Sequence, residues 1–282
     1  MDSVKVKSFA KLNLTLFVTG AKDGFHMLDS IAVTVDLYDS VKVKKRRDGL
    51  VSVRMYGMGS ENIPYESNNA VKAAKAFSEK YGCGGADITV YKNIPIGLGA
   101  GGSSADAAGV LKAMSRLYKV DDVAGIKLLA DSLGSDTKYM LSGGYARLTG
   151  RGDAVKKLES GLKLSFLLLA PQERISTAQC FKEFDVCGTL GGDGDKAEKA
   201  VLNGDLYGLA ESMGNSLYPA AKRLSGEVET AYRELEAFSP LAVGMTGSGS
   251  GVYALFETDE LCEYAKSRYN GKFTPYCLKT VL

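Results

Sequence analysis

The stretch from Pro95 to Ala108 constrains this chain more than any other part of its sequence. It reads Pro-Ile-Gly-Leu-Gly-Ala-Gly-Gly-Ser-Ser-Ala-Asp-Ala-Ala, and four of the six residues from Gly97 to Gly102 are glycine. Glycine lacks a Cβ, so such a loop lets the backbone approach a ligand closely. The run from Ala105 to Met114 predicts a helix, and the first N–H groups of a helix attract anions, usually phosphate. We therefore expect a phosphate cradle, in which Ser103 and Ser104 cap the helix, touch phosphate or hold Mg²⁺.

Two widespread phosphate-binding loops fit this stretch poorly. A P-loop has a Lys before its Ser or Thr, and no Lys follows Gly101-Gly102. The dinucleotide pattern Gly-x-Gly-x-x-Gly is present from Gly97 to Gly102, with Asp121 or Asp122 at a suitable distance beyond it. That pattern, however, follows an apolar buried strand, whereas segment 87–92 alternates polar and apolar residues. A dinucleotide site is therefore a distant alternative.

Composition and charge exclude several classes of function. The chain has 282 residues, enough for one large or two ordinary domains, and a formal net charge of +2. This balance gives no polyelectrolyte signal, so we expect neither nucleic acid nor a membrane as a partner. The five cysteines form no Cys-x-x-Cys pair, which argues against zinc or redox chemistry and favours free thiols in the cytoplasm. No apolar run approaches the ~20 residues of a membrane helix.

The order of the expected elements indicates an α+β fold. In the first half, we expect strands at 4–9, 12–18, 31–37, 41–45, 51–56, 87–92 and 145–149, and helices at about 69–82, 105–114 and 121–134. We also expect a turn at Asp23-Gly24, and a cap at Asn68 or Asn69 for a helix that ends at Gly82. In the second half, we expect strands at 164–170, 243–245, 252–256 and 273–278, and helices at about 176–184, 196–213, 226–238 and 259–268. The character changes near residue 159, so we expect domains at 1–158 and 159–282. Asp185 to Asp195 contains four glycines and is expected to be a mobile loop.

Four segments together resemble the GHMP kinase superfamily, the sugar and mevalonate kinases. The glycine stretch resembles its central motif, Pro-x-Gly-x-Gly-Leu followed by Gly-Ser-Ser-Ala or Gly-Gly-Ser-Ser-Asp, and Thr246–Gly251 resembles its later Thr-Gly-Ser/Thr-Gly motif. Ser8–Leu14 resembles the Ser-Pro-Ala-Lys-Leu-Asn-Leu opening of the 4-diphosphocytidyl-2-C-methyl-D-erythritol kinase family. Asp23–Leu28 resembles that family's Asp-Gly-Tyr-His-x-Leu. The resemblance extends over nearly the whole chain, in the same order.

This resemblance implies a fold and an activity. It implies a two-domain GHMP kinase fold, with a ribosomal-protein-S5-like, ATP-binding N-terminal domain and a ferredoxin-like C-terminal substrate domain. It implies ATP and Mg²⁺ as cofactors, and phosphorylation of a hydroxyl of 4-diphosphocytidyl-2-C-methyl-D-erythritol in the non-mevalonate route to isoprenoid precursors. It further implies a cytoplasmic enzyme that is a monomer or a homodimer.

The resemblance also implies roles for single residues. Lys11 matches the family's catalytic Lys, and Asp136 ends a Gly-Ser-Asp segment that matches the family's Gly-Ala-Asp. The Asp would accept the hydroxyl proton, and the Lys would stabilise charge on the transferred phosphoryl group. His26, the single histidine of the chain, would read the edge of a cytosine that Phe25 and Phe181 sandwich. Taken alone, Lys11 would be a solvated Lys and Phe181 a buried helix aromatic.

The remaining expected contacts come from the same motifs. Phosphate would be bound by Pro95, Gly97, Gly99, Gly101, Gly102, Ser103 and Ser104, with Ser104 also at the metal. Substrate would be contacted by Asn13, Gly247, Ser248 and Gly249, in addition to Phe25, His26 and Phe181.

The chain also departs from the family pattern. Ala100 replaces a Leu, Ser103 a Gly and Ala105 a Ser, and Lys138 adds a cation beside the expected base. These departures leave two alternatives open. One is a GHMP kinase for another small alcohol, such as homoserine or mevalonate. The other is a catalytically silent GHMP-fold protein that binds nucleotide and acts as a regulator.

Overall fold

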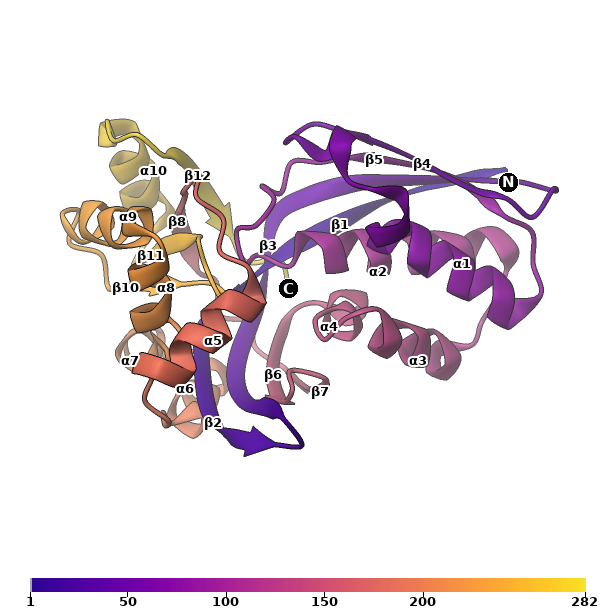
Figure 1. The fold of residues 1–282 in the computed structure, drawn as a ribbon. Coiled ribbons are helices and arrows are strands. Elements are labelled where there is room, and N and C mark those ends of the chain that lie inside the picture. Colours follow the sequence, from indigo (N-terminus) through magenta and orange to yellow (C-terminus); the bar gives the residue numbers. More distant parts are fainter. Residues whose placement is uncertain (1) are drawn as a thin grey trace. The chain divides into compact units, whose positions relative to one another are not determined.

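The computed structural model describes residues 2–282, which divide into two compact units (Figure 1). Unit 1 comprises the described part of Met1–Ala10 with Leu37–Ile96 and Gly101–Ser142, and unit 2 comprises Lys11–Asp36, Gly97–Ala100 and Gly143–Leu282. Strands β1 (Ser3–Asn13) and β3 (Phe25–Lys45) contribute residues to both units. This division is discontinuous along the chain, so the expected domain boundary between residues 158 and 159 stays a prediction.

The strands of unit 1 bury one of their two faces. The unit holds parts of β1 and β3 together with β4 (Val51–Tyr56) and β5 (Ala86–Tyr91). β3 pairs antiparallel with β5, and β5 pairs parallel with β4. Val41 lies opposite Val90 and Val43 lies opposite Ile88, and all four side chains are buried. Such β-branched residues at every second position fit a strand that packs on one side.

Helices cover the buried face of these strands in Figure 1. They are α1 (Asn69–Tyr81) and α2 (Gly102–Tyr118). The helices α3 (Val123–Leu133) and α4 (Thr137–Ser142) pack against α1 and α2, and the short 3₁₀ turns η1 (Ser60–Asn62) and η2 (Tyr65–Ser67) precede α1. The expected ends of α1 are confirmed, because the Asn68 side chain accepts from Ala70 N and Gly82 takes the left-handed conformation that ends the helix. Phe77 and Met114 lie in the shared core of helices and strands.

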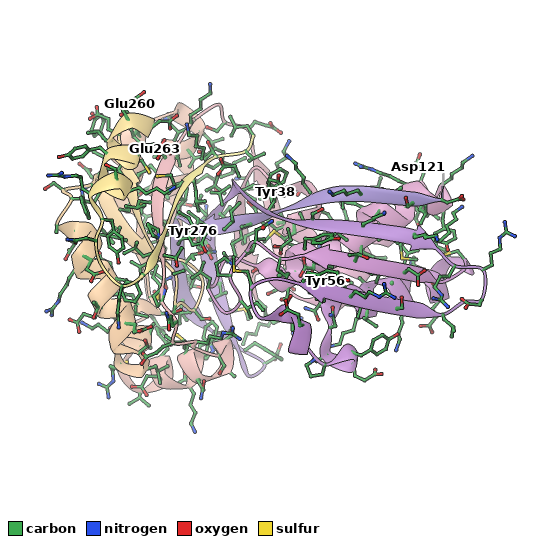
Figure 2. The ribbon with its side chains drawn as sticks, turned by 90° about the horizontal axis from the view of Figure 1, so that it is seen from above. Tyr38, Tyr56, Asp121, Glu260, Glu263 and Tyr276 are labelled. Atoms are coloured by element: carbon green, nitrogen blue, oxygen red, sulfur yellow. The ribbon has the colours of Figure 1, made fainter. Side chains whose placement is uncertain are left out.

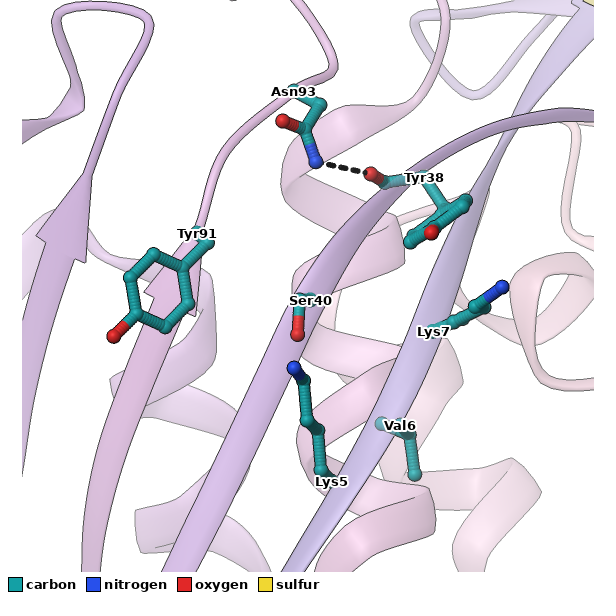
Figure 3. A pocket seen from close by; sticks show the side chains of 7 residues that line it. All are labelled: Lys5, Val6, Lys7, Tyr38, Ser40, Tyr91 and Asn93. Carbon is teal, nitrogen blue, oxygen red and sulfur yellow. Dashed lines mark hydrogen bonds between the residues drawn. The ribbon is translucent and has the colours of Figure 1, made fainter.

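The opposite face of the unit 1 strands is polar, with Tyr38 and Tyr56 among its side chains (Figure 2). It holds a hollow of about 640 Å³, shown in Figure 3, which is lined by Lys5, Val6, Lys7, Tyr38, Ser40, Tyr91 and Asn93. Asn93 Nδ2 donates a hydrogen bond to the backbone oxygen of Tyr38 at 2.9 Å (Figure 3). None of these residues is among the expected site residues.

Unit 2 contains a β-hairpin that carries several expected site residues. The strands around it are β2 (Thr15–Lys22), the first part of β3, β6 (Tyr145–Gly150), β7 (Ala154–Leu158) and β9 (Gly214–Asn215). β2 and β3 pair antiparallel with Lys22 opposite Phe25. The two residues between them, Asp23 and Gly24, have φ values of +52° and +76°. Positive φ at both positions is the type I′ geometry that favours Asp-Gly, so the expected turn is confirmed.

A second sheet forms the rest of unit 2. Its strand order is β10-β11-β8-β12, all antiparallel, with β8 (Ser165–Ala170), β10 (Ala242–Met245), β11 (Val252–Phe256) and β12 (Thr274–Lys279). The helices of unit 2 are α5 (Thr177–Cys187), α6 (Gly194–Asn203), α7 (Leu206–Ser212), α8 (Tyr218–Leu224), α9 (Gly226–Glu236) and α10 (Asp259–Arg268), of which α6 packs against β2, β6 and β7. Helices and strands share a core that includes Leu167, Leu169, Val252 and Ala254. The α+β fold class is therefore confirmed.

Several element boundaries differ from the sequence-based expectation. β1 continues through the expected break after residue 9, and β3 is one strand of 21 residues where two were expected. The expected helix 196–213 is two helices, because Gly204 adopts φ +68° and Asp205 then caps α7. α5 extends to Cys187, so Asp185 lies in a helix and not in the expected mobile loop. α4 and α8 were not expected.

Two further expectations concern the whole chain. All five cysteines are free thiols in the structure, as expected. Among residues 2–282, no helix combines the length and the apolar character that crossing a membrane requires.

Candidate active site

The end of β1 carries two expected site residues whose side chains meet. Lys11 and Asn13 are both buried, and Lys11 Nζ donates a hydrogen bond to Asn13 Oδ1. Asn13 Oδ1 also accepts from Gly247 N at 3.0 Å, and Asn13 Nδ2 donates to Ser30 Oγ at 2.8 Å. The Asn13 amide thus ties the expected catalytic lysine to the Thr246–Gly251 loop. Its expected contact with substrate stays a prediction.

Two glycine-rich segments of unit 2 pack backbone against backbone. Gly99 has φ +75°, and a Cβ at this position would lie 2.1 Å from Thr246 O. Thr246 Oγ1 donates to Gly99 O at 3.1 Å, and Gly251 N donates to Leu98 O at 3.1 Å. A Cβ at Gly247 would likewise lie 2.9 Å from Gly99 O. At Gly99 and Gly247, close packing of the two loops therefore already requires glycine.

Side chains outside the expected set hold the Thr246–Gly251 loop in place. Asn215 Nδ2 donates to Met245 O at 2.8 Å and to Gly247 O at 2.9 Å. The Ser248 hydroxyl lies 3.2 Å from the Thr177 hydroxyl at the start of α5. The loop is thus fixed by neighbours that lie far from it in the sequence.

The other expected loop residues have distinct surroundings. A Cβ at Gly249 would lie 3.0 Å from Met245 Sδ, and a Cβ at Gly97 would lie 2.9 Å from Cγ of Arg174. The exposed Arg174 therefore carries its stem across Gly97, which brings a cation beside the glycine stretch that the sequence did not single out. Pro95 lies in unit 1.

The glycine stretch continues in unit 1 as the first turn of α2. Gly101, with φ +72°, is the N-cap of this helix, and no side chain makes a capping hydrogen bond. The helix begins at Gly102, so Ser103 and Ser104 lie inside its first turn. Of the three roles expected for these serines, helix capping was wrong, because the left-handed Gly101 is the N-cap, and contact with phosphate or Mg²⁺ stays a prediction. The first N–H groups of any helix lack intrahelical acceptors, as a phosphate cradle requires.

A buried triad of charges lies against the second turn of α2. Lys92 Nζ donates to Asp106 Oδ2 at 2.7 Å and to Asp39 Oδ2, and none of the three side chains is more than 5 % exposed. Asp39 Oδ1 also accepts from Asn93 N and Ile94 N, whereas Asp106 Oδ1 has no hydrogen-bond partner among the described residues. Burial acts to lower the pKa of Lys92, but the negative charges of Asp106 and Asp39 outweigh burial, so the pKa is raised. One cation cannot balance two buried carboxylates, and burial raises the pKa of Asp106 to about 7.

This raised pKa predicts a pH dependence of stability. From pH 3.8, the ordinary value, up to about 7, the native state keeps a proton on Asp106 that the unfolded chain has released. The contribution of Asp106 to stability must therefore fall as the pH rises through this window. The Asp106→Asn variant lacks the titrating group, so its melting temperature relative to the unaltered protein should increase from pH 5 to pH 8. A difference in melting temperature between the two proteins that stays constant from pH 5 to pH 8 would contradict the raised pKa of Asp106.

Asp136, the expected base, is half-buried and immediately precedes α4 in unit 1. Lys138, the rival cation, forms an ion pair with Asp131 of α3 at 2.9 Å. Ser104 Oγ lies 3.6 Å from the place that a Cβ at Gly134 would occupy, so the first turn of α2 and the end of α3 approach each other here. Lys11 lies in unit 2, and its pairing with Asp136 stays a prediction.

The three residues expected to bind a base all lie in unit 2. Phe25 is 53 % exposed, and the guanidinium carbon of Arg151 lies 4.7 Å from its ring centroid. The His26 ring stacks on Phe181 with centroids 4.7 Å apart and an interplanar angle of 23°, and His26 Nε2 lies 2.7 Å from Asp185 Oδ1. In the structure, His26 therefore contacts Phe181. Arg151 beside Phe25 and Asp185 beside His26 are two further neighbours of this group that the sequence analysis did not name. Asp185 falls four residues after Phe181 on one helix face, a spacing that could have pointed to it.

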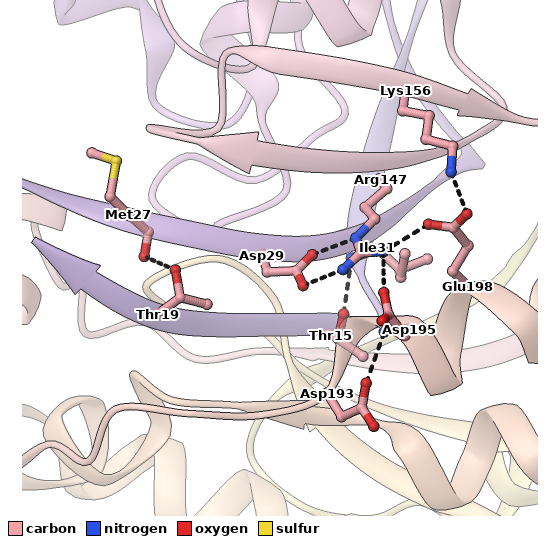
Figure 4. Close-up of polar contacts among 10 residues, drawn as sticks. All are labelled: Thr15, Thr19, Met27, Asp29, Ile31, Arg147, Lys156, Asp193, Asp195 and Glu198. Atoms are coloured by element: carbon pink, nitrogen blue, oxygen red, sulfur yellow. Dashed lines mark hydrogen bonds and ion pairs between the residues drawn. The ribbon is translucent and has the colours of Figure 1, made fainter. Parts of the chain in front are cut away.

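An ion-pair network centred on Arg147 anchors the hairpin strand β3 (Figure 4). Arg147 makes two hydrogen bonds to Asp29, at 2.7 and 2.6 Å, and also donates to Asp195 at 2.6 Å and Glu198 at 2.9 Å. Lys156 Nζ donates to Glu198 as well. These residues join β3, β6, β7 and α6. The hydrogen bonds that Arg147 donates to Asp29, Glu198 and Asp195 raise its pKa. The guanidinium therefore stays charged and holds the strand that carries Phe25 and His26.

Comparison with protein families agrees with this architecture. Residues 68–145 match the GHMP kinases N terminal domain, and residues 197–271 match the GHMP kinases C terminal domain. The chain belongs to the GHMP kinase family and is an ATP-dependent phosphotransferase that acts on a small molecule.

Three individual proteins show which kinases this chain resembles. A 4-diphosphocytidyl-2-C-methyl-D-erythritol kinase from Clostridium beijerinckii is 32% identical over 279 residues, which cover 96% of this chain and 98% of the relative. The crystal structure of a 4-(cytidine 5'-diphospho)-2C-methyl-D-erythritol kinase has a TM-score of 0.81 at 27% identity and covers 98% of both chains. A homoserine kinase from Cytophaga hutchinsonii has a TM-score of 0.76 at 17% identity, covering 100% of this chain and 95% of that one, and shares the fold.

Proposed function

We propose that this enzyme transfers the γ-phosphoryl group of ATP to a hydroxyl of 4-diphosphocytidyl-2-C-methyl-D-erythritol, a step towards isoprenoid precursors by the non-mevalonate route. The observation that carries this proposal is the grouping of Phe25, His26 and Phe181 in one compact unit. An exposed aromatic ring beside a stacked histidine suits a flat base far from the reacting hydroxyl. The near-full-length likeness to kinases of that name supports the same substrate.

The first turn of α2 is the proposed site for the ATP phosphates, because helix N-termini bind anions through unpaired N–H groups. We propose that Mg²⁺ accompanies the nucleotide and that the Ser104 hydroxyl would be one of the groups that hold it. The Ser104 hydroxyl is an oxygen donor of the kind that Mg²⁺ prefers, and it lies in the first turn of α2, where the phosphates are proposed to bind. Bound Mg²⁺ would neutralise charge on the phosphates during transfer.

Asp136 is the proposed general base and Lys11 the proposed charge-stabilising group. Asp136 takes the proton of the substrate hydroxyl, whose oxygen then attacks the γ-phosphorus, and ADP leaves. Lys11 is buried and held by Asn13, so its ammonium is preorganised and loses little freedom when substrate binds. Phosphoryl transfer asks for positioning and electrostatic stabilisation above all, which these groups supply.

Stacking on Phe25 predicts a measurable loss when its ring is removed. Stacking of one base on an aromatic side chain contributes roughly 1–3 kcal/mol, so Phe25→Ala should lower kcat/KM for the cytidyl substrate about 5–150-fold. ATP binding should be unchanged, because the nucleotide phosphates bind elsewhere. Tyr264, an exposed ring of α10 in the same unit, provides the control variant Tyr264→Ala, whose kcat/KM should equal that of the unaltered enzyme.

Calorimetry with CMP tests the base site without turnover. We expect CMP to bind the unaltered protein at millimolar concentration or below, and to bind Phe25→Ala more weakly. Absence of CMP binding, together with full activity of Phe25→Ala, would exclude the cytidyl compound as the substrate and favour a kinase for another small alcohol.

A further inference from the structure

Three side chains of α5 fix the orientation of the His26 ring. Phe181 stacks on it, Phe184 meets it edge-on at 5.8 Å with an interplanar angle of 86°, and Asp185 Oδ1 lies 2.7 Å from its Nε2. Positions 181, 184 and 185 share one face of a helix, so one rigid element holds the ring by its face, its edge and one nitrogen.

The contact with Asp185 selects the tautomer of His26. An ionised carboxylate only accepts hydrogen bonds, so Nε2 must carry the hydrogen that it donates to Asp185. In the neutral ring, Nδ1 then presents a lone pair. The opposite tautomer would set the lone pair of Nε2 against the carboxylate. Among residues 2–282, His26 Nδ1 has no hydrogen-bond partner. It does not belong to the fully buried side-chain atoms that lack a partner.

We infer that Asp185 is a specificity-determining residue that makes His26 an acceptor for the amino group of a base. The inference rests on the proposed function, in which a cytosine binds beside His26. The 4-amino group of cytosine donates a hydrogen bond, which Nδ1 can accept. Uracil presents a carbonyl oxygen at the same place, and two lone pairs would then face each other. Asp185 therefore favours cytosine over uracil without touching either base.

The exposure of the Asp185 side chain indicates that its contact with His26 does more than pack the core. The side chains of His26 and Asp185 are 22% and 60% exposed. The largely exposed carboxylate adds little to the core, and the two phenylalanines already hold the ring. The neighbouring acid on the same helix, Glu183, is engaged with Arg223 at 2.6 Å and provides a matched control.

Calorimetric titration with CMP and UMP tests the inference in the full-length protein. We expect the unaltered enzyme to bind CMP more tightly than UMP. Asp185→Asn has the same shape but can donate or accept, so it imposes no tautomer, and its CMP-to-UMP affinity ratio should fall about tenfold, the value of one hydrogen bond. Asp185→Ala should behave alike, and Glu183→Gln should keep the ratio of the unaltered enzyme. The measured quantity is a ratio, so a general loss of packing would cancel.

The single histidine of the sequence allows a direct observation of the tautomer. In untagged protein labelled with ¹⁵N-histidine, long-range ¹H–¹⁵N spectra above pH 8 should show Nε2 protonated and Nδ1 bare, and Asp185→Ala should show a mixture. A ring protonated at Nδ1 in the unaltered protein would overturn the inference. So would a CMP preference that survives unchanged in Asp185→Asn, which would leave the proposed function standing. An unaltered enzyme that binds CMP and UMP equally would overturn the inference alone, whereas an unaltered enzyme that binds neither nucleotide would count against the proposed function as well.

Discussion

Replacement of Asp136 by Asn should lower kcat roughly 10²–10⁴-fold, the usual contribution of general base catalysis. The amide keeps the shape of the side chain and cannot take the hydroxyl proton. The KM for ATP should change little, because the nucleotide is expected to bind at the first turn of α2. Steady-state kinetics with a coupled ADP assay measure both parameters. Turnover retained in Asp136→Asn would place the base elsewhere.

A comparison of two lysine variants completes this prediction. Lys138 is paired with Asp131, whereas Lys11 is buried beside Asn13. We therefore expect Lys11→Ala to lose more activity than Lys138→Ala. A larger loss in Lys138→Ala would reverse the assignment of the catalytic cation. Melting curves of both variants separate loss of activity from loss of fold.

The Arg147→Met variant should be among the least stable single substitutions in unit 2. Arg147 makes bidentate contact with Asp29 and also bonds to Glu198, and these acids are 15% and 11% exposed. Removal of one partner from a buried ion pair typically costs about 3–5 kcal/mol, because the remaining charges lose their compensation. For a unit of this size, about 3 kcal/mol corresponds to a fall of roughly 6–12 °C in melting temperature. Thermal unfolding followed by circular dichroism measures it.

A surface ion pair of the same unit provides the control for Arg147→Met. Lys157 and Glu159 lie 2.8 Å apart, and their side chains are 58% and 82% exposed. Exposed pairs contribute about 0–1 kcal/mol, so Lys157→Met should shift the melting temperature by a few degrees at most. Equal shifts in the two variants would show that the Arg147 network does not anchor β3.

Local sequence signals predicted the elements that depend on near neighbours. The Asn68 cap, the terminal Gly82, the Asp23-Gly24 turn and the bounds of α10 all follow from chemistry within a few residues. The expected break within β3 was wrong for a long-range reason. Asp39 is a buried acid within this strand, and it is tolerated because it pairs with Lys92, 53 residues away. A sequence does not reveal that a polar residue has such a partner.

The candidate site shows the same limit. Motifs that are contiguous in the chain pointed to Lys11, Asn13, His26 and Asp136. Their organising partners are distant in sequence, as with Asp185, which lies 159 residues from His26. The glycine-rich motif also explained only part of why glycine is required at these positions. The need for glycine at Gly99 comes from a second loop that begins 147 residues later.

The most direct measurement of the central claim is ATP consumption by the purified enzyme over a panel of alcohols, with the phosphorylated product identified by mass spectrometry. The panel contains 4-diphosphocytidyl-2-C-methyl-D-erythritol, its uridine analogue, homoserine and mevalonate, each with ATP and Mg²⁺. We predict rapid phosphorylation of the cytidyl compound, slower reaction of the uridine analogue and no reaction of the two small alcohols. Phosphorylation of homoserine or mevalonate with no reaction of the cytidyl compound would contradict the proposed function.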